Sequence, residues 1–473
     1  MIFDKAPTAP NVRPQFNIGG LMDIPSGSYL PGPRGESILN SGISLTNAVV
    51  GPQNSFKTAL LVYLFLTVLS RYLGSRMALY DTEGSFSYMR LNKMLKNVDR
   101  LRDLAVSQEE SDLIQLVDGV KMLGDEYFEI VKEFGKERMK NKKTELKTTP
   151  FEGVAGQLMQ LMPPIMVLTD SITEFKSSSV EKGIVDKNNI GDAGANTQYM
   201  RDANAKTQMI RQLPNLAENA GFLFGNTAHT GRKIEMGGKY DPKDAQLTFS
   251  RKGAKVKGAP EKFEFINNNF WEIFYAAPFP NSSSDKSAKY PLSDADRMDG
   301  QTDFQKVICV QTRSKGGPSG FRFEFLFSQE LGFLPDLTQF HFIKDTCGGY
   351  GIEGSAINYN LALKPDVNLS RTKVRGLLKE NYLLRRAVEI TSEMAQMDQL
   401  WRLDPKYKCT PAELYEDIKK LGYDWDTLLN TRGWWCFEED LDKELPFLST
   451  MDLLKMRAGE YKPYWWPKDN KAA

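Results

Sequence analysis

Residues 51–58 read GPQNSFKT. The segment follows a short apolar run, SLTNAVV at 44–50, and precedes a longer one, ALLVYLFLTVLSRYL at 59–73. It matches the pattern G-x-x-x-x-G-K-[S/T] except at the second glycine, where Phe56 stands. In such a loop, successive backbone N–H groups surround phosphate oxygens at the positive end of a helix. The order of strand, loop and helix therefore predicts a phosphate-binding loop in a nucleotide-binding α/β fold.

The pattern assigns a role to each end of this segment, which we call the phosphate loop. Lys57 would contact the terminal phosphates of ATP, and the Thr58 hydroxyl would bind Mg²⁺. The residues expected to line the nucleotide are Gly51, Pro52, Gln53, Asn54, Ser55 and Phe56, together with Lys57 and Thr58. The Phe56 side chain must point away from the phosphates, and its backbone must keep a negative φ or bear strain.

Two acidic residues follow later apolar runs. Glu83 comes just after RMALYDT (76–82), and Asp170 ends PIMVLTD (164–170). Parallel strands bring their carboxyl ends to one edge of a sheet, so both carboxylates are expected near the phosphate loop. Asp170 would hold Mg²⁺ through water, and Glu83 would orient and deprotonate the attacking water.

A fourth run, GFLFGN at 221–226, ends in Asn226. A polar side chain at this point can sense the terminal phosphate and move the segment behind it. His229 is the competing candidate for the same role, because it lies three residues further along. The sequence leaves the choice between these two residues open.

The bulk composition excludes several other classes of protein. The chain has 473 residues, too many for one hydrophobic core, and a formal net charge of +1. Its four cysteines form no CxxC pair, and with only two histidines the sequence offers little for a structural metal site or a disulfide framework. No apolar run approaches the roughly 20 residues that span a bilayer. We expect a soluble cytoplasmic protein with no membrane partner.

The runs divide the chain into three parts. Residues 1–35 are rich in Pro, Gly and Ser and are expected to form an N-terminal arm. Residues 36–345 hold the runs already named and two more, KVICVQT (306–312) and FRFEFLF (321–327). They predict an α/β core with a mainly parallel central sheet. Residues 346–473 contain six of the seven tryptophans and are expected to form a smaller α+β domain, with the tryptophans in its core rather than serving as base-stacking platforms.

A charged segment interrupts the predicted core. Residues 92–147 carry apolar side chains at helical spacing: Leu116, Val120, Leu123, Tyr127, Ile130, Val131 and Phe134. This spacing predicts an inserted helical hairpin whose apolar stripe packs on the core. The alternative is a helix that binds a partner.

The motifs together resemble a known family. GPQNSFKT is similar to the loop of phage UvsX-type recombinases, relatives of bacterial RecA, in which Ser-Phe-Lys-Ser is found. YDTEGSFS (80–87) resembles the YDSE of those phage proteins and the DTEG of archaeal and eukaryotic recombinases. TDSITEF (169–175) resembles the family's IDS segment, and VQTRSKGGPSGFRFEF (310–325) its basic strand pair. The resemblance covers roughly residues 40–330.

The resemblance implies a RecA-like, DNA-dependent ATPase that acts in recombination and repair. Such a protein forms filaments on single-stranded DNA, hydrolyses ATP at subunit interfaces, and pairs that strand with a homologous duplex for strand exchange. Arg313 and Lys315 fall where the family places basic residues that reach the neighbour's ATP. Tyr88 and Arg90 match the position that stacks on adenine. A mediator or single-strand-binding protein is a possible partner, and a phage-encoded chain would work in the host cytoplasm.

The family contacts DNA through two loops, which here would lie within 177–205 and 229–262. The second stretch holds nine Lys and Arg residues against four acids. Such an excess suits binding to a phosphate backbone. The residues expected to contact DNA are Arg232, Lys233, Arg251, Lys252, Lys255 and Lys257.

The N-terminal arm departs from the family pattern. RecA-type filaments use an N-terminal helix and a strand that docks on the next subunit, whereas residues 1–35 are too rich in proline to predict that helix. Phe16 and Ile18 could serve as the hydrophobic anchor instead. Two alternatives to the recombinase stay open: a ring-forming RecA-fold helicase or accessory repair ATPase, and a nucleotide-binding scaffold in which Phe56 prevents turnover.

Overall fold

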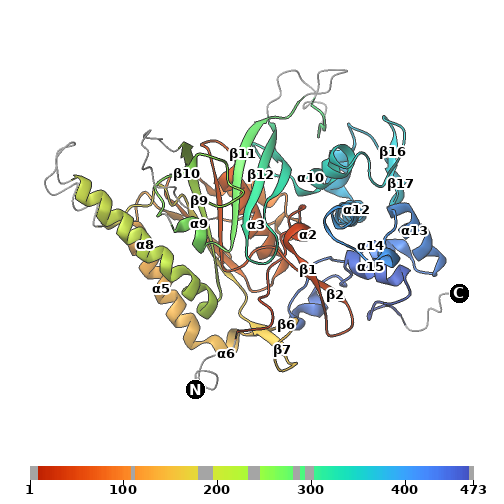
Figure 1. Ribbon diagram of the computed structural model, residues 1–473, viewed down its shortest axis with the longest axis horizontal. Helices are drawn as coiled ribbons and strands as arrows, with labels where there is room; N and C mark the ends of the chain where they lie inside the picture. The colour runs from red at the N-terminus through yellow and green to blue at the C-terminus, as the bar shows by residue number, and fades with distance from the viewer. Residues whose placement is uncertain are drawn as a thin grey trace.

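A twisted sheet occupies the middle of the molecule, with helices on both faces and a helical C-terminal region on one side (Figure 1). The computed structural model describes residues 9–107, 112–178, 195–232, 246–260, 262–280, 288–292 and 303–467, with the backbone alone for 195–201. The first DNA loop expected from the sequence lies largely outside these residues. Lys233 and much of the second loop also lie outside them.

The central sheet has ten strands. Nine follow one another in space: β14 (Gly332–Phe333), β13 (Phe321–Ser328), β12 (Phe304–Ser314), β11 (Asn269–Pro278), β3 (Thr46–Gly51), β9 (Phe222–Arg232), β8 (Ile165–Asp170), β4 (Arg76–Asp81) and β5 (Ile114–Asp118). The tenth, β10 (Ala254–Val256), pairs with the end of β9. All six strands expected from the sequence are present.

The central sheet is mixed, and only part of it is parallel, whereas the sequence predicted a mainly parallel sheet. The strands from β11 through β5 run parallel, whereas β12, β13, β14 and β10 pair antiparallel to their neighbours. Hydrophobic patterning did not reveal β11, because Glu272 and flanking asparagines break its apolar run. β3 and β9 are neighbours, but the chain leaves β3 toward β4 and leaves β9 toward β11, on the other side of β3. The two connections therefore run in opposite directions, as they do at a ligand-binding switch point of α/β sheets.

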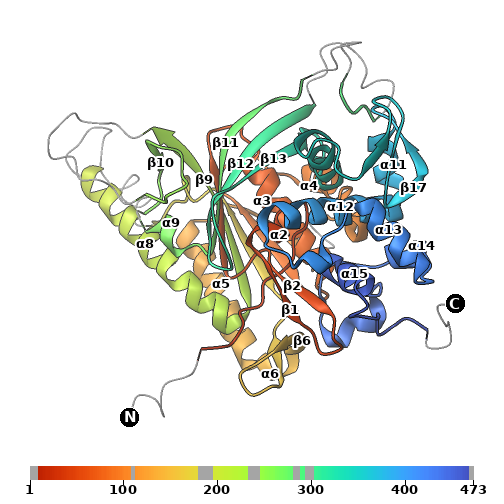
Figure 2. The same cartoon turned by 45° about the vertical axis from the view of Figure 1, so that its right-hand side comes forward.

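Successive residues of the parallel strands enter two different cores. Val49, Met77 and Leu168 pack with α3 (Lys57–Arg71) on one face, whereas their neighbours Val50 and Val167 pack on the other. That second face is covered by α5 (Gly124–Lys140) and α8 (Ala195–Ala220), which lie side by side in both ribbon views (Figures 1 and 2). This alternation holds the parallel strands between helices, as a βαβ arrangement requires.

The helical hairpin predicted for 92–147 is wrong. Leu116 belongs to the edge strand β5, and only α5 carries the helical stripe. Within that stripe Tyr127 and Val131 are buried, whereas Ile130 is 51% exposed and Phe134 is 39% exposed. The spacing misled because alternating residues of a short strand can fall on a helical period by chance. The segment continues through α6 (Lys142–Glu145) to the hairpin of β6 (Lys147–Glu152) and β7 (Leu158–Leu161), which follows it.

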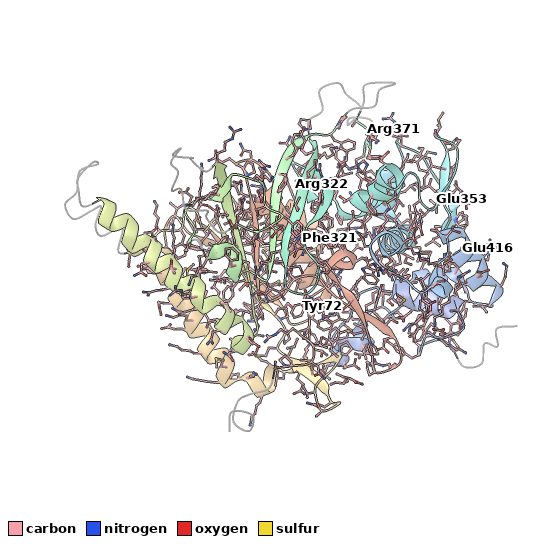
Figure 3. All side chains as sticks on the ribbon, viewed as in Figure 1. Tyr72, Phe321, Arg322, Glu353, Arg371 and Glu416 are labelled. Atoms are coloured by element: carbon pink, nitrogen blue, oxygen red, sulfur yellow. The ribbon has the colours of Figure 1, made fainter. Side chains whose placement is uncertain are left out.

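The N-terminal segment packs on this chain's own core. Phe16 pairs with Ile43 in an isolated β-bridge, and Phe16 and Ile18 are 6% and 0% exposed. Tyr72, which is labelled in Figure 3, joins the segment to the rest: its ring lies 4.8 Å from that of Phe16 and 4.7 Å from that of Trp435. Phe16 and Ile18 are therefore occupied within the subunit and do not form an exposed anchor. α2 (Asp23–Ser26) and the hairpin of β1 (Ser28–Pro31) and β2 (Ser37–Asn40) follow.

The C-terminal region combines a small antiparallel sheet with helices. Its elements are β15 (Ile352–Gly354), β16 (Tyr359–Leu361), β17 (Lys364–Leu369), α11 (Val374–Glu380), α12 (Tyr382–Leu400), α13 (Pro411–Lys420), α14 (Trp425–Leu429) and α15 (Thr450–Arg457). It shares one hydrophobic cluster with β12, β13 and α10 (Pro335–His341), while Trp435 enters the cluster around α3. All six of its tryptophans are at least partly buried, as expected for core residues.

Candidate nucleotide-binding site

The phosphate loop connects β3 to α3 at the carboxyl edge of the sheet, where β3, β4 and β8 end. Gly51 closes β3 against β11, and a Cβ at this position would lie 3.0 Å from that of Ile273 and 2.8 Å from Ser55 Oγ. Only glycine allows so close an approach. The Ser55 hydroxyl donates to the Pro52 carbonyl at 2.7 Å, which tightens the turn. Gln53 and Asn54 are exposed at its tip.

Phe56 occupies a left-handed conformation with φ 66° and ψ 19°. That conformation costs a non-glycine residue about 1–2 kcal/mol. Of the two alternatives expected for Phe56, a negative φ or a strained backbone, the structure therefore shows the strained backbone. Its ring lies 5.1 Å from that of Phe327 on β13 and packs against the cluster around α3. The side chain therefore points away from the loop interior, and burial offsets the backbone cost.

Lys57 lies inside the loop. It is 6% exposed, and its Nζ donates to the Pro52 carbonyl at 2.7 Å. Burial lowers the pKa of Lys57, while the charges of Asp170 and Glu83 act in the opposite direction. Both acids are therefore close enough to influence this amine. A phosphate oxygen would replace a neutral carbonyl with a charged acceptor, a stronger partner for an ammonium group.

Asp170 and Thr58 meet as the sequence predicts for a magnesium site. The Thr58 hydroxyl donates to Asp170 Oδ2 at 2.7 Å, and the Thr227 hydroxyl donates to Oδ1. Asp170 is 2% exposed, and burial raises its pKa despite these two hydrogen bonds. Carboxylate and hydroxyl oxygens, with water, suit Mg²⁺. The residues present therefore fit a nucleotide with its cation, and Thr58 and Asp170 are the residues that would hold the cation.

Glu83 lies in a turn that buried acceptors hold in shape. Asp81 accepts hydrogen bonds from the backbone N–H groups of Glu83 at 3.1 Å and Phe86 at 2.7 Å. The N–H of Thr82 donates to the Asp170 carbonyl at 2.7 Å, which joins the ends of β4 and β8. The Glu83 carboxylate lies 3.0 Å from Nε2 of His229. Glu83 and Asp170 therefore share one edge with Lys57.

β9 carries both sensor candidates, at different positions along the strand. The strand continues to Arg232, so Asn226 lies within it and does not end it as expected, because β10 prolongs the pairing. Asn226 pairs in register with Ala48, whereas His229 pairs with Gly51 at the start of the loop. His229 contacts Glu83, while the Asn226 side-chain nitrogen is buried without a hydrogen-bond partner in the described chain. His229 therefore contacts Glu83, whereas the side-chain nitrogen of Asn226 can still donate a hydrogen bond to a ligand.

The two residues expected to stack on adenine lie on α4 (Tyr88–Leu95). The Tyr88 hydroxyl accepts a hydrogen bond from the backbone N–H of Leu116 at 3.2 Å, and the Arg90 guanidinium lies 5.3 Å from the Phe86 ring. Neither side chain contacts the phosphate loop through a hydrogen bond or ion pair in the described part of the chain. Their role in base binding stays a prediction.

Arg313 and Lys315 lie at the opposite edge of the sheet, which we call the amino edge. Ser314 pairs with Asn269, and Asn269 pairs with Asn47 near the start of β3. At about 3.3 Å per residue, the run from Asn47 to Gly51 separates the two edges by about 13 Å. The basic pair is therefore remote from this chain's own phosphate loop.

The expected DNA contacts divide into two groups. Arg232, Lys255 and Lys257 lie on or beside the β9–β10 hairpin, and Arg232, Lys252, Lys255 and Lys257 are exposed. Arg251 differs: its backbone N–H donates to Glu272 at 3.1 Å, and its guanidinium donates to the Phe274 carbonyl. Arg251 thus anchors its segment to β11.

Sequence reasoning missed Thr227 and Asp81. Thr227 holds Asp170 in place, and Asp81 shapes the turn that carries Glu83. Both are polar residues inside otherwise apolar strands, and that signal could have identified them, since buried polar groups are nearly always hydrogen-bonded.

Three comparisons with known proteins give a distant structural similarity. No protein-family model matches the sequence, and no curated protein matches it. Among solved structures, the chain is similar to the RadB recombinase with 14% sequence identity and a TM-score of 0.33, over 62% of this chain and 92% of that one. The class that fold and site define is an α/β protein with a large mixed sheet and a phosphate loop at a switch point of that sheet.

No helix in the described ranges has the length and apolar character needed to cross a bilayer.

Proposed function

We propose that the protein is a RecA-type, DNA-dependent ATPase of recombination and repair. One observation carries the proposal: the phosphate loop, its Thr58–Asp170 pair and Glu83 meet at the carboxyl edge of the sheet. A phosphate loop with a buried lysine suits ATP, and an oxygen-donor pair beside it suits Mg²⁺. The polar turn after β4 adds Glu83, an acid to which this arrangement gives no part in holding ATP or Mg²⁺.

The side chains would divide the chemistry of ATP hydrolysis among them. Lys57 would bind the terminal phosphates, and Thr58 and Asp170 would hold the cation, which neutralises charge on the phosphates when bound. Glu83 would orient the attacking water and accept its proton. His229 touches Glu83 at 3.0 Å, so it would set the position of that carboxylate.

DNA binding would be linked to this chemistry through the β9–β10 hairpin. The exposed side chains of Arg232, Lys255 and Lys257 supply positive charge for a phosphate backbone. His229 lies at the base of the same hairpin, where its carbonyl accepts from Lys257 N–H at 2.8 Å and its own N–H donates to Thr173 Oγ1 at 3.0 Å. A DNA strand that shifts the hairpin would therefore shift the partner of Glu83.

Self-association would complete the site. The Arg313 guanidinium and the Lys315 amine have no acidic partner in the described chain, and both lie far from this chain's loop. A neighbouring subunit's nucleotide would supply the missing negative charge, as with an arginine finger given in trans. β5 ends the sheet on one side, and an outer strand can accept a strand from another chain. Filament formation on single-stranded DNA and strand exchange with a homologous duplex follow from this proposal, with a mediator or single-strand-binding protein as a further partner.

The test is the rate of ATP hydrolysis with and without single-stranded DNA, measured beside electron microscopy of the same mixture. We expect turnover that DNA stimulates, helical filaments on the DNA, and loss of turnover in Lys57→Ala. Hydrolysis by Lys57→Ala at the wild-type rate would refute the site. ATP binding by the wild type without turnover would favour the scaffold.

One observation favours a ring-forming RecA-fold helicase or accessory ATPase as the second candidate. Phe16 and Ile18 are buried in this chain's own core, so the N-terminal segment offers no free anchor for the usual filament contact. Closed rings in the micrographs, with DNA-stimulated turnover, would select this candidate over the recombinase.

A further inference from the structure

A cavity lies between α3, beside the central sheet, and the C-terminal region. It has a volume of about 500 Å³ and is lined by the end of α3, residues 97–103, the start of α10, α12 and residues 434–445. Figure 2 shows α3 and α12 close together on this side of the sheet, away from α5 and α8. Its walls contain none of the residues of the phosphate loop, and its volume falls within the range of small-molecule sites.

Among the arginines that line this cavity, Arg71 is the one whose guanidinium donates no hydrogen bond within the described residues. It ends α3, its side chain is 14% exposed, and its guanidinium lies 4.4 Å from the ring of Trp434. Its nearest carboxylate, Asp23, is 4.0 Å away and already accepts the N–H groups of Ile18 at 3.1 Å and Gly19 at 2.8 Å. Within the described residues the Arg71 guanidinium donates no hydrogen bond, although all its nitrogens are donors.

The other four arginines of the lining all pair with carboxylates, and Arg385 does so with Asp99 at 2.8 Å. Arg100 pairs with Glu444, Arg386 with Glu389 at 2.5 Å, and Arg102 with Asp99 at 2.6 Å. Asp103 and Asp336 also line the cavity, so its five arginines face five acids and the lining carries no net charge. Arg71 differs from the other four arginines because its guanidinium donates no hydrogen bond within the described residues.

The unsatisfied buried atoms of the wall are also all donors. Arg102 Nε, Arg386 Nε and Trp434 Nε1 are buried without a hydrogen-bond partner in the described chain, and no buried acceptor of the lining shares that condition. Arg386 is itself 1% exposed. An unmet buried donor costs about 1–3 kcal/mol, so the cavity favours a ligand that brings acceptors.

We propose that this cavity is a binding site for a small oxyanion, a phosphate or carboxylate group, held by Arg71 against Trp434. A guanidinium stacked on an aromatic ring keeps its in-plane donors free, and these match the two oxygens of such a group. The ligand would contact both α3 and α12. α3 is the helix that begins at Lys57, about 21 Å from Arg71 at 1.5 Å per residue. The proposal does not rest on the proposed ATPase function.

The test is calorimetric titration of the full chain with inorganic phosphate and, separately, with citrate, in the Lys57→Ala background so that the phosphate loop contributes little. We expect saturable binding of at least one anion. Arg71→Gln should weaken it by about tenfold or more, because a charged hydrogen-bond donor is lost. Arg13→Gln is the charge-matched control, since that arginine is exposed, pairs with Glu218 and does not line the cavity, so the affinity should stay within about threefold.

Trp434→Phe supplies a second variant in case Arg71→Gln does not fold. It keeps a ring beneath the guanidinium and removes one unmet donor, so binding should weaken by a few-fold while the melting temperature stays close to that of the parent. Phosphate binding without citrate binding would identify phosphate as the ligand chemistry, and the reverse would identify a carboxylate. The proposal would be overturned if neither phosphate nor citrate bound, or if Arg71→Gln and its parent bound the anion with equal affinity.

Discussion

The two edges of the central sheet carry candidate functional residues that differ in how they are paired. At the carboxyl edge the candidate groups contact one another: Asp170 holds Thr58 and Thr227, and Glu83 faces His229. At the amino edge Arg313 and Lys315 meet no carboxylate in the described chain, and burial together with the charges of Arg313 and Arg13 lowers the pKa of Lys315. The carboxyl edge is therefore organised by contacts within the chain, whereas under the proposed function the amino edge would receive negative charge from a neighbouring subunit's nucleotide.

The largest effect is expected where the two edges would meet between subunits. The double variant Arg313→Gln with Lys315→Gln should lower DNA-stimulated turnover by about 10³-fold or more, as loss of a finger given in trans does. ATP affinity of the isolated chain should stay within about threefold, because these residues lie at the far edge. Steady-state hydrolysis and nucleotide titration measure the two quantities.

Mixing variants decides whether the basic pair acts across the interface. In an equimolar mixture of the double variant with Glu83→Gln, random pairing leaves about a quarter of interfaces with both an intact acid and an intact basic pair. Turnover near that fraction of wild type supports action in trans. If the mixture stays as inactive as its components, the basic pair does not act in trans. The amino edge of one subunit would then not contribute to the ATP site of its neighbour.

Glu83→Gln should itself lower turnover by about 10²–10³-fold, because the amide cannot accept the water's proton. ATP binding should persist, since Lys57, Thr58 and Asp170 remain. Glu133→Gln on the exposed face of α5 is the matched control and should leave turnover unchanged. Single-turnover kinetics with a nucleotide-binding assay separate the two steps. Equal rates for Glu83→Gln and wild type would assign the proton acceptor elsewhere.

The sequence was informative about the strands that deliver the site and less so about what completes it. GPQNSFKT, Glu83 and Asp170 were placed at one edge by the rule for parallel strands, and the structure brings them together. The edge strand β5 was mistaken for helix because a strand of five residues offers too few positions to distinguish the two periods. Phe16 is buried because its ring packs against Tyr72 and Trp435, and Ile18 lies in the same hydrophobic cluster. These contacts join segments far apart in the sequence, so a local pattern does not predict them.

A smaller effect is expected from His229→Ala. The variant removes the contact between Glu83 and the base of the β9–β10 hairpin. Stimulation of turnover by single-stranded DNA should fall by about tenfold, within the usual range of coupling between sites, while turnover without DNA changes little. The Asn226→Ala variant provides the contrast, because no hydrogen bond joins Asn226 to Glu83 within the described residues. Should Asn226→Ala abolish the stimulation and His229→Ala preserve it, Asn226 would be the sensor.

The smallest effect concerns the residue that interrupts the phosphate-loop pattern. Phe56 combines a left-handed backbone with a ring packed on Phe327, so the two contributions can be separated by a pair of variants. Phe56→Ala and Phe56→Gly both lose the ring, but only glycine adopts φ 66° without strain. The glycine variant should therefore be more stable than the alanine variant by about 1 kcal/mol in urea unfolding. If alanine proved as stable as glycine, the left-handed turn would carry no cost. Phe56 would then be an ordinary packing residue and not a strained feature of the organised edge.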